Sequence, residues 1–201
     1  MRILLITVMF LSQSSWAKCP TKDMKCETDV QYVERSTKSK IYNNQIGRNK
    51  LLLPGSNTLT AFTEQPDGDT GDFEILLNIF VPQKDGQYDW DKIRACEMEG
   101  GSPILRSFFY VNADRDPDLE IGVICGWERS NAFQDCPNFD EVRFFKLSKG
   151  KELGKLSRID DTKFSKFYEK KKLKKNDDLE CTRGLFTNAD DIKRILQTLG
   201  Y

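Results

Sequence analysis

The stretch LRSFFYVNADRDPDLEIGVICGW, residues 105–127, decides the fold class. Two runs rich in β-branched and aromatic residues, 105–111 and 119–127, flank a segment rich in Asn, Asp and Pro at 112–118. Runs of the first kind favour β-strands, and Asn, Asp and Pro between them favour a turn. The stretch therefore predicts two antiparallel strands joined by an acidic loop.

A unit of the same kind precedes this one in the chain. Residues 59–63 and 73–81 form two strand-like runs around the acidic segment 65–72. In both units the second run carries a Glu-Ile pair directly after its first residue, at Glu74 and at Glu120. Two copies are too few for a solenoid or a propeller, which need three or more units. We therefore expect two similar hairpins within an ordinary sheet.

The remaining runs extend this pattern and then change period. Residues 93–97 and 142–147 again read as strands bounded by turn residues. Towards the C-terminus, two apolar stripes follow the spacing of a helix face: Phe164, Phe167 and Tyr168, then Ile192, Ile195, Leu196 and Leu199. Thr187 or Asn188 is placed to cap the last helix. These patterns predict an α+β fold, mainly antiparallel β and sandwich-like, with C-terminal helices packed on the sheet.

The first 17 residues read as a secretory signal peptide. Arg2 precedes an apolar stretch at 3–11, and Ser15 and Ala17 form a small-x-small cleavage site. A bilayer span needs about 20 apolar residues, so this stretch is too short to be one. A buried N-terminal strand or helix is the alternative, but the order of charge, apolar run and small residues favours cleavage near Ala17. We expect a secreted or periplasmic protein.

The mature chain is expected to be soluble, without a stable membrane anchor. A lipid-modified cysteine requires a small residue before it, and Lys18 stands before Cys19. Residues 18–50 are polar and read as an N-terminal arm or a first irregular strand, and 51–201 as a single β-rich domain. The chain has 31 basic and 31 acidic residues, so no overall field attracts it to nucleic acid.

All six cysteines lie after the signal, and an even number in an exported chain favours disulfides. The chain has no histidine and no Cys-x-x-Cys pair, so the usual zinc sites lack their ligands. Six cysteines allow 15 connectivities. We prefer the pairings that close short loops first: Cys19 with Cys26, Cys125 with Cys136, and then Cys96 with Cys181.

The acidic loop at 112–118 carries the clearest chemistry in the sequence. Asn112, Asp114, Asp116 and Glu120 alternate so that several oxygens can point at one ion, and calcium takes six to eight oxygens. The loop resembles the aspartate-rich calcium loop of FG-GAP and VCBS-type repeats, which implies a calcium site. It departs from that pattern at Pro117, where a glycine is expected. The alternative is that both acidic loops are solvated hairpin turns.

Two segments are candidates for contact with partners. Residues 126–139 form a loop that carries Trp127, Phe133 and Phe139, which suits either a recognition surface or a core beneath the loop. A basic segment suits contact with an anionic polymer or membrane surface, although such a run is more often a solvated helix face. Its lysines are Lys163, Lys166, Lys170, Lys171, Lys172, Lys174 and Lys175.

The function expected from these patterns is binding. Without histidine, the commonest general base and activator of nucleophiles is missing. The chain also resembles small exported bacterial proteins, some of them similar to β-sandwich immunity proteins that inhibit lysozymes. The resemblance lies in the export signal, the hairpin at 112–121, the aromatic strand near Phe144 and Phe145, and the final helix at 191–196. It implies a binder or inhibitor of another exported protein. The alternative is an exported hydrolase of a wall polymer or glycan, with Glu74 and Glu120, or acids of the two loops, as a carboxylate pair about 5 to 10 Å apart.

Overall fold

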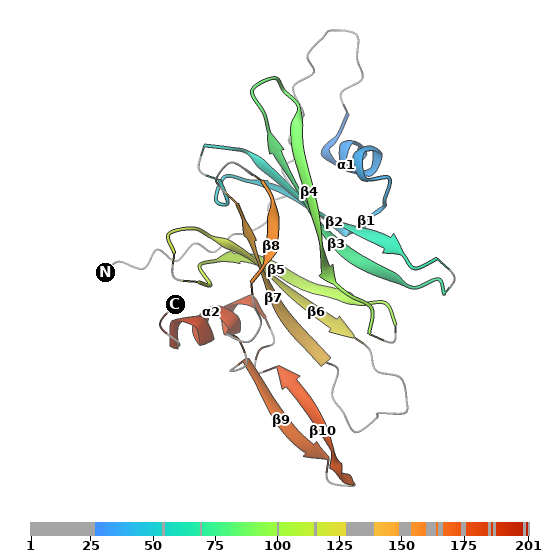
Figure 1. Ribbon diagram of the computed structural model, residues 1–201, viewed down its shortest axis with the longest axis vertical. Coiled ribbons are helices and arrows are strands. Elements are labelled where there is room, and N and C mark those ends of the chain that lie inside the picture. Colours follow the sequence, from blue (N-terminus) through green and yellow to red (C-terminus); the bar gives the residue numbers. More distant parts are fainter. Residues whose placement is uncertain are drawn as a thin grey trace.

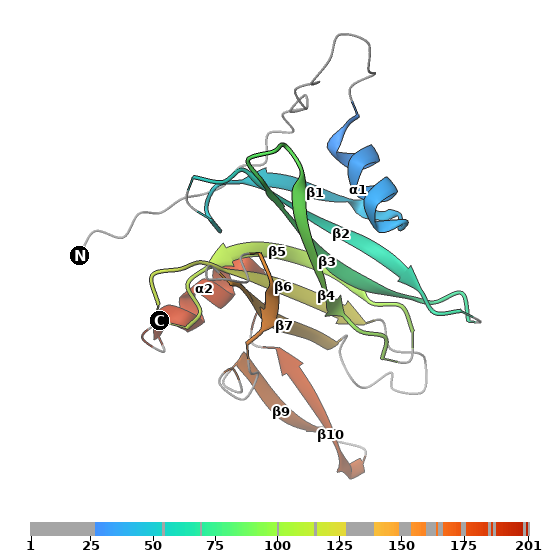
Figure 2. The ribbon, with the colours of Figure 1, turned by 45° about the horizontal axis from the view of Figure 1, so that its top comes forward.

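The structure is a computed structural model that describes residues 27–53, 55–68, 70–99, 101–114, 116–127, 139–148, 154–159, 164, 167–173, 176–184, 186, 188–198 and 200. Two four-stranded antiparallel sheets face each other, with a helix against the outer side of each (Figure 1, Figure 2). The predicted α+β fold, mainly antiparallel β, is confirmed.

The first sheet is built from consecutive strands in the order β1-β2-β3-β4. Their bounds are Ile41–Asn49, Thr58–Pro66, Phe73–Pro82 and Tyr88–Cys96. On β3, Ile75, Leu77 and Ile79 belong to the core between the sheets. Phe80 faces the other way and packs with Val33 of helix α1, Asp29–Thr37. The alternation of strand side chains thus gives this sheet a buried layer on both faces.

Helix α1 and strand β1 correct the boundary expected at residue 50. A capping box starts the helix, since Thr28 accepts from the Gln31 backbone and the Gln31 side chain accepts from the Thr28 backbone. β1 pairs with β2 along the edge of the first sheet. Residues 29–49 therefore belong to the folded β-rich region. Of the two expectations, the irregular strand fits β1, whose register shifts between Ile41 and Ile46, and the arm does not.

The second sheet has the order β5-β6-β7-β8, with bounds Ile104–Val111, Glu120–Trp127, Phe139–Leu147 and Leu156–Arg158. Its outer face carries Phe109, Ile124 and Phe144, which share one apolar cluster with Ile192 and Leu196 of helix α2, Ala189–Thr198. The predicted final helix is confirmed. Asn188 caps it, because its Oδ1 accepts from the backbone nitrogens of Asp190 and Asp191 at 2.9 and 3.0 Å.

The helix expected around residues 163–175 is wrong. Tyr168–Leu173 is strand β9, which pairs antiparallel with β10, Asn176–Gly184. Backbone pairing with the next segment replaces helical hydrogen bonds, and the register sets Lys172 opposite Glu180. Phe164 and Phe167 are buried in the outer cluster of the second sheet, so their spacing reflects packing on Phe144.

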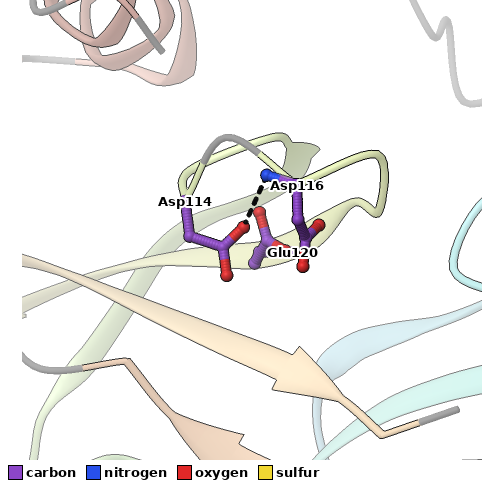
Figure 3. A group of neighbouring side chains, drawn as sticks. All are labelled: Asp114, Asp116 and Glu120. Carbon is purple, nitrogen blue, oxygen red and sulfur yellow. Dashed lines mark hydrogen bonds between the residues drawn. The ribbon is translucent and has the colours of Figure 1, made fainter.

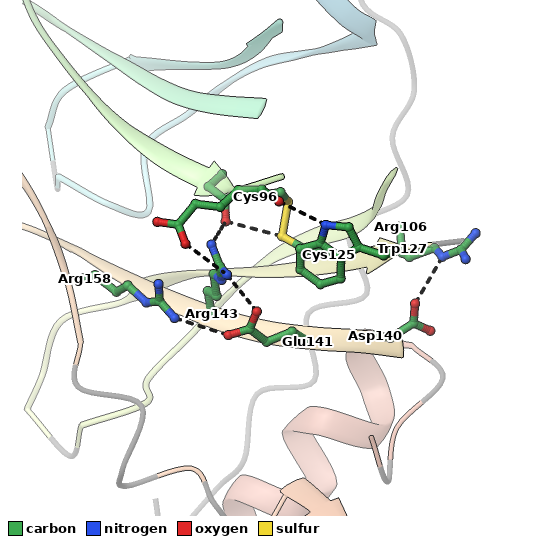
Figure 4. Close-up of a disulfide and its surroundings, with 10 residues drawn as sticks. Cys96, Arg106, Cys125, Trp127, Asp140, Glu141, Arg143 and Arg158 are labelled. Atoms are coloured by element: carbon green, nitrogen blue, oxygen red, sulfur yellow. Dashed lines mark hydrogen bonds and ion pairs between the residues drawn. A yellow bond between two sulfur atoms is a disulfide. The ribbon is translucent and has the colours of Figure 1, made fainter. Parts of the chain in front are cut away.

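One disulfide joins the two sheets and overturns two of the expected pairings. Cys96, at the end of β4, is bonded to Cys125 on β6, with the two Cα atoms 5.7 Å apart (Figure 4). The pairings of Cys125 with Cys136 and of Cys96 with Cys181 are therefore wrong. Strand alternation turns both cysteines into the core between the sheets, where they meet although 29 residues separate them in sequence. Cys19, Cys26, Cys136 and the Cys181 side chain lie outside the described residues.

Candidate metal site in the β5–β6 loop

Three carboxyl groups gather at the loop that joins β5 to β6. Asp114 and Asp116 come from the loop, and Glu120 is the first residue of β6 (Figure 3). One oxygen from each lies within 4.8 Å of the others. The sequence predicted this convergence, because alternate acids in a tight loop turn towards one point.

The loop is held in shape by its own side chains. The backbone nitrogen of Asp116 donates to Asp114 Oδ1 at 3.2 Å, and that of Asp118 donates to Asp116 Oδ1 at 2.8 Å. These are turns of the kind that Asp side chains make with the backbone two residues on. Asn112, predicted as a ligand, donates from its amide nitrogen to the carbonyl oxygen of Asp116. In this structure Asn112 therefore braces the loop.

Glu120 is the least solvated member of the group. The residue has 0% of its surface exposed, and its Oε2 accepts from the backbone nitrogen of Ala113 at 2.6 Å. Its Oε1 is buried without a hydrogen-bond partner. Burial raises the pKa of Glu120 to about 7, the bond from Ala113 opposes that rise, and the charges of Asp114 and Asp116 add to it. A buried carboxylate oxygen of this kind needs a cation or a proton.

Lys146 supplies a positive charge from the neighbouring strand β7. Its Nζ lies 2.8 Å from Asp114 Oδ2 and also pairs with Asp116 Oδ2. The hydrogen bond from Lys146 lowers the pKa of Asp116, and the bonds to both aspartates raise the pKa of Lys146. With Lys146 protonated, the site still carries an excess of negative charge when Glu120 is ionised.

The donor set fits a hard cation. Each of the three carboxyl groups uses one oxygen to hold a backbone nitrogen of the loop. The second oxygens are Asp114 Oδ2 and Asp116 Oδ2, which pair with Lys146, and Glu120 Oε1, which has no hydrogen-bond partner. Carboxylate oxygens are the ligands that calcium prefers, with water completing its coordination. The loop therefore presents three oxygens that its own backbone does not use.

The β2–β3 loop does not gather its acids in this way. Asp67 and Asp72 close a turn, with the Asp67 nitrogen donating to the Asp72 carbonyl oxygen at 2.9 Å. The Asp72 carboxylate accepts from Ser102 Oγ at 2.9 Å. In the described part of the chain, the β5–β6 loop is the one place where three acidic, cysteine or histidine ligands come together.

The proposed carboxylate pair of a hydrolase is not formed by Glu74 and Glu120. Glu74 forms an ion pair with Arg94 of β4 at 2.9 Å. The β2–β3 loop and the β5–β6 loop lie at opposite ends of the sandwich (Figure 1, Figure 2). Glu74 follows the first loop and Glu120 ends the second, so the two glutamates do not share a cleft.

Trp127, one of the three aromatic residues expected on a docking loop, lies in the core. Its side chain belongs to the cluster between the sheets, and the residue is 3% exposed. Its Nε1 donates to the carbonyl oxygen of Glu97 at 2.9 Å. Its role as a contact for partners is therefore corrected to one in packing. Phe133 and the side chain of Phe139 lie outside the described residues.

Arg143 is a buried charge that the sequence analysis missed. The residue is 2% exposed, pairs with Glu141 at 2.7 Å and donates to the carbonyl oxygen of Ala95 at 3.2 Å (Figure 4). Its guanidinium lies 5.9 Å from the centre of the Trp127 ring. Alternation along β7 gave the signal, since Arg143 has the same parity as the inward-facing Phe145. These contacts tie β7 to the end of β4.

We found no match to this chain among protein family models, curated proteins or solved structures. The resemblances to calcium-loop repeats and to lysozyme-inhibiting proteins therefore stay predictions. Within the ranges that the structure describes, no helix combines the length and apolar character that a membrane span requires.

Proposed function

We propose that this protein is an exported binding protein whose β5–β6 loop holds a calcium ion. One observation carries the proposal: the carboxylates of Asp114, Asp116 and Glu120 converge, and the buried Glu120 Oε1 has no hydrogen-bond partner. A divalent cation at this point would neutralise that oxygen and the two aspartates together. The remaining oxygens of the three groups already hold the loop, so the site needs little rearrangement.

Calcium fits these donors better than the other common metals. All the ligand atoms are oxygens, and the chain has no histidine for a zinc site. Magnesium demands near-ideal octahedral geometry and gives up its water reluctantly, whereas calcium accepts irregular carboxylate cages. An ion at this position would hold the surface loop in one conformation, which suits a protein that binds a partner.

Export and partner binding rest on the sequence and on one structural feature. The segment 1–17 has the order of a secretory signal, and the Cys96–Cys125 bridge suits an oxidising compartment. The absence of histidine from the whole chain favours binding or inhibition over acid–base catalysis. The proposed partner is another exported protein, and crosslinking in an envelope extract is the way to identify it.

The metal part of the proposal is tested by thermal unfolding of the oxidised protein with excess calcium and with chelator. Calcium that binds only the folded state should add about 2.7 kcal/mol to the free energy of unfolding when its free concentration is 100 times the dissociation constant. Asp114→Ala and Asp116→Ala should each abolish this shift. Asp67→Ala and Asp69→Ala, in the β2–β3 loop, are the matched controls and should retain it.

A melting temperature that does not respond to calcium would contradict the proposal. The β5–β6 loop would then be an acidic turn neutralised by Lys146 alone. A response lost in the Asp69→Ala variant as well would show that the two acidic loops share one site, against their separation in the fold.

A further inference from the structure

We infer that Lys146 is a tethered competitor for the calcium site: its ammonium group stands where the ion binds, and the ion must displace it. This inference rests on the proposed calcium site and goes further, because it assigns the residue that regulates occupancy. Lys146 lies on β7, outside the loop that supplies the acids.

The contacts of Lys146 are with the oxygens that a cation would use. Its Nζ contacts Oδ2 of Asp114 and Oδ2 of Asp116. The Oδ1 atoms of the same two residues accept backbone nitrogens of the loop. The ammonium therefore occupies the side of both carboxylates that faces away from the loop backbone, and a metal ion needs the same side.

Lys146 and calcium exclude each other for two reasons. An ammonium group has three donors and no lone pair, so Lys146 cannot serve as a ligand once the ion is present. A divalent ion held by the same carboxylates would also lie within a few ångströms of the ammonium charge, and like charges at such a distance repel strongly. Binding the ion must therefore expel the ammonium.

The side chain is able to leave without disturbing the sheet. It is 34% exposed, and a lysine carries its charge on a flexible four-carbon stem. Rotation about that stem would move the ammonium into solvent while β7 keeps its pairing with β6. The loop would then be closed in both states, by Lys146 without calcium and by the ion with it.

Two consequences follow for the site. Displacing an ion pair costs free energy, so Lys146 weakens calcium binding and sets the concentration at which the loop fills. Filling the site also releases a lysine at the rim of the loop, so calcium changes the charge that the protein presents there to a partner.

The test is a calcium titration by calorimetry of the oxidised wild-type protein and of Lys146→Met. Removing the competitor should tighten binding about tenfold or more, which corresponds to about 1.4 kcal/mol. Lys84→Met is the matched control, since it removes one charge from the exposed turn between β3 and β4 and should leave affinity unchanged. A Lys146→Met protein that binds calcium no more tightly than wild type would overturn the inference.

A second measurement uses the wild-type chain and needs no variant to fold. Lys146 should react faster with an amine-acetylating reagent in calcium than in chelator, while Lys84 reacts at the same rate in both, as read by mass spectrometry of peptides. A Lys146 rate that stays constant or falls would overturn the inference even if calcium binds. A calcium concentration of about 10 mM lies above the range of weak extracellular sites. If neither the wild-type protein nor Lys146→Met binds calcium at that concentration, both the proposed calcium site and the inference about Lys146 are wrong.

Discussion

The acidic loops that follow β2 and β5 each lead into a strand with a Glu-Ile pair at or next to its start, yet the two glutamates have different surroundings. Glu74 keeps 15% of its side chain exposed and pairs with Arg94 on the neighbouring strand. Glu120 is fully buried, with one oxygen on the Ala113 nitrogen and the other without a partner. A similar sequence therefore yields a surface ion pair in one sheet and a candidate ion site in the other.

The two hairpins also differ in the residue two positions after each glutamate. β3 has Leu76 there and β6 has Gly122. A Cβ atom at Gly122 would fall against the ring of Phe109, so glycine allows that ring to lie directly on β6. The comparison teaches that a pattern of acids does not define a metal site. The neighbours decide whether each carboxylate retains an oxygen that nothing else uses.

The largest expected effect comes from removing the disulfide that joins the two sheets. Replacing both Cys96 and Cys125 by serine should lower the free energy of unfolding by about 2 to 5 kcal/mol, because the bridge restricts the unfolded chain. Urea unfolding under non-reducing conditions measures this. The calcium-dependent shift should persist, since its ligands all belong to the β5–β6 hairpin. Loss of that shift would mean that the site depends on the contact between the sheets.

A smaller effect is expected from the glycine that distinguishes β6 from β3. Gly122→Ala should destabilise the protein by about 1 to 3 kcal/mol, because the new methyl group displaces the Phe109 ring. Gly68→Ala is the control in the β2–β3 loop, where a Cβ meets nothing within 4 Å, and should change stability by less than about 0.5 kcal/mol. Combining Gly122→Ala with Phe109→Leu should recover part of the loss, and equal losses in the single and double variants would contradict this explanation.

The smallest effect is a pH dependence carried by Glu120. Its pKa is about 7 in the folded protein, above the ordinary value of 4.5 that the unfolded chain should show. The folded state thus holds this proton more tightly, so the associated stability is complete below pH 4.5 and is lost as the pH rises towards 7 and beyond. In chelator, urea unfolding should show a loss of up to about 2.5 kcal/mol between pH 5 and pH 8.

Two variants assign that pH dependence. Glu120→Gln should remove the fall in stability between pH 5 and pH 8, because a neutral amide has no proton to lose. Glu74→Gln should keep it, since Glu74 sits in a partly exposed ion pair with Arg94. A fall that survives Glu120→Gln would show that another group is responsible.

Strands with strong apolar runs were predictable, and weakly apolar ones were not. The expected runs at 73–81 and 119–127 match β3 and β6, which are buried between neighbours in their sheets. β4 begins at Tyr88, earlier than the expected start at 93. As an edge strand it carries exposed Asp89 and Lys92, which hide the alternation. β1 is polar for the same reason and was expected only as an arm or an irregular strand.

The acids of the candidate site were predictable because they are neighbours in sequence. Lys146 was not, because β6 separates its strand from β5 and only sheet pairing brings it to the loop. The Cys96–Cys125 bridge escaped prediction for a similar reason. It depends on two sheets facing each other, and a preference for disulfides that close short loops does not predict that arrangement.

The order of strands in the first sheet has a consequence for how the chain folds. Every pairing in that sheet joins consecutive strands, and all of them lie within residues 41–96. During synthesis from the N-terminus, the chain can therefore complete this sheet before the strands of the second sheet have been made. Such local pairings also form faster than distant ones. The apolar inner face of the first sheet would then remain exposed to solvent until β5 to β7 pack against it. The chain is therefore most prone to aggregate in that interval.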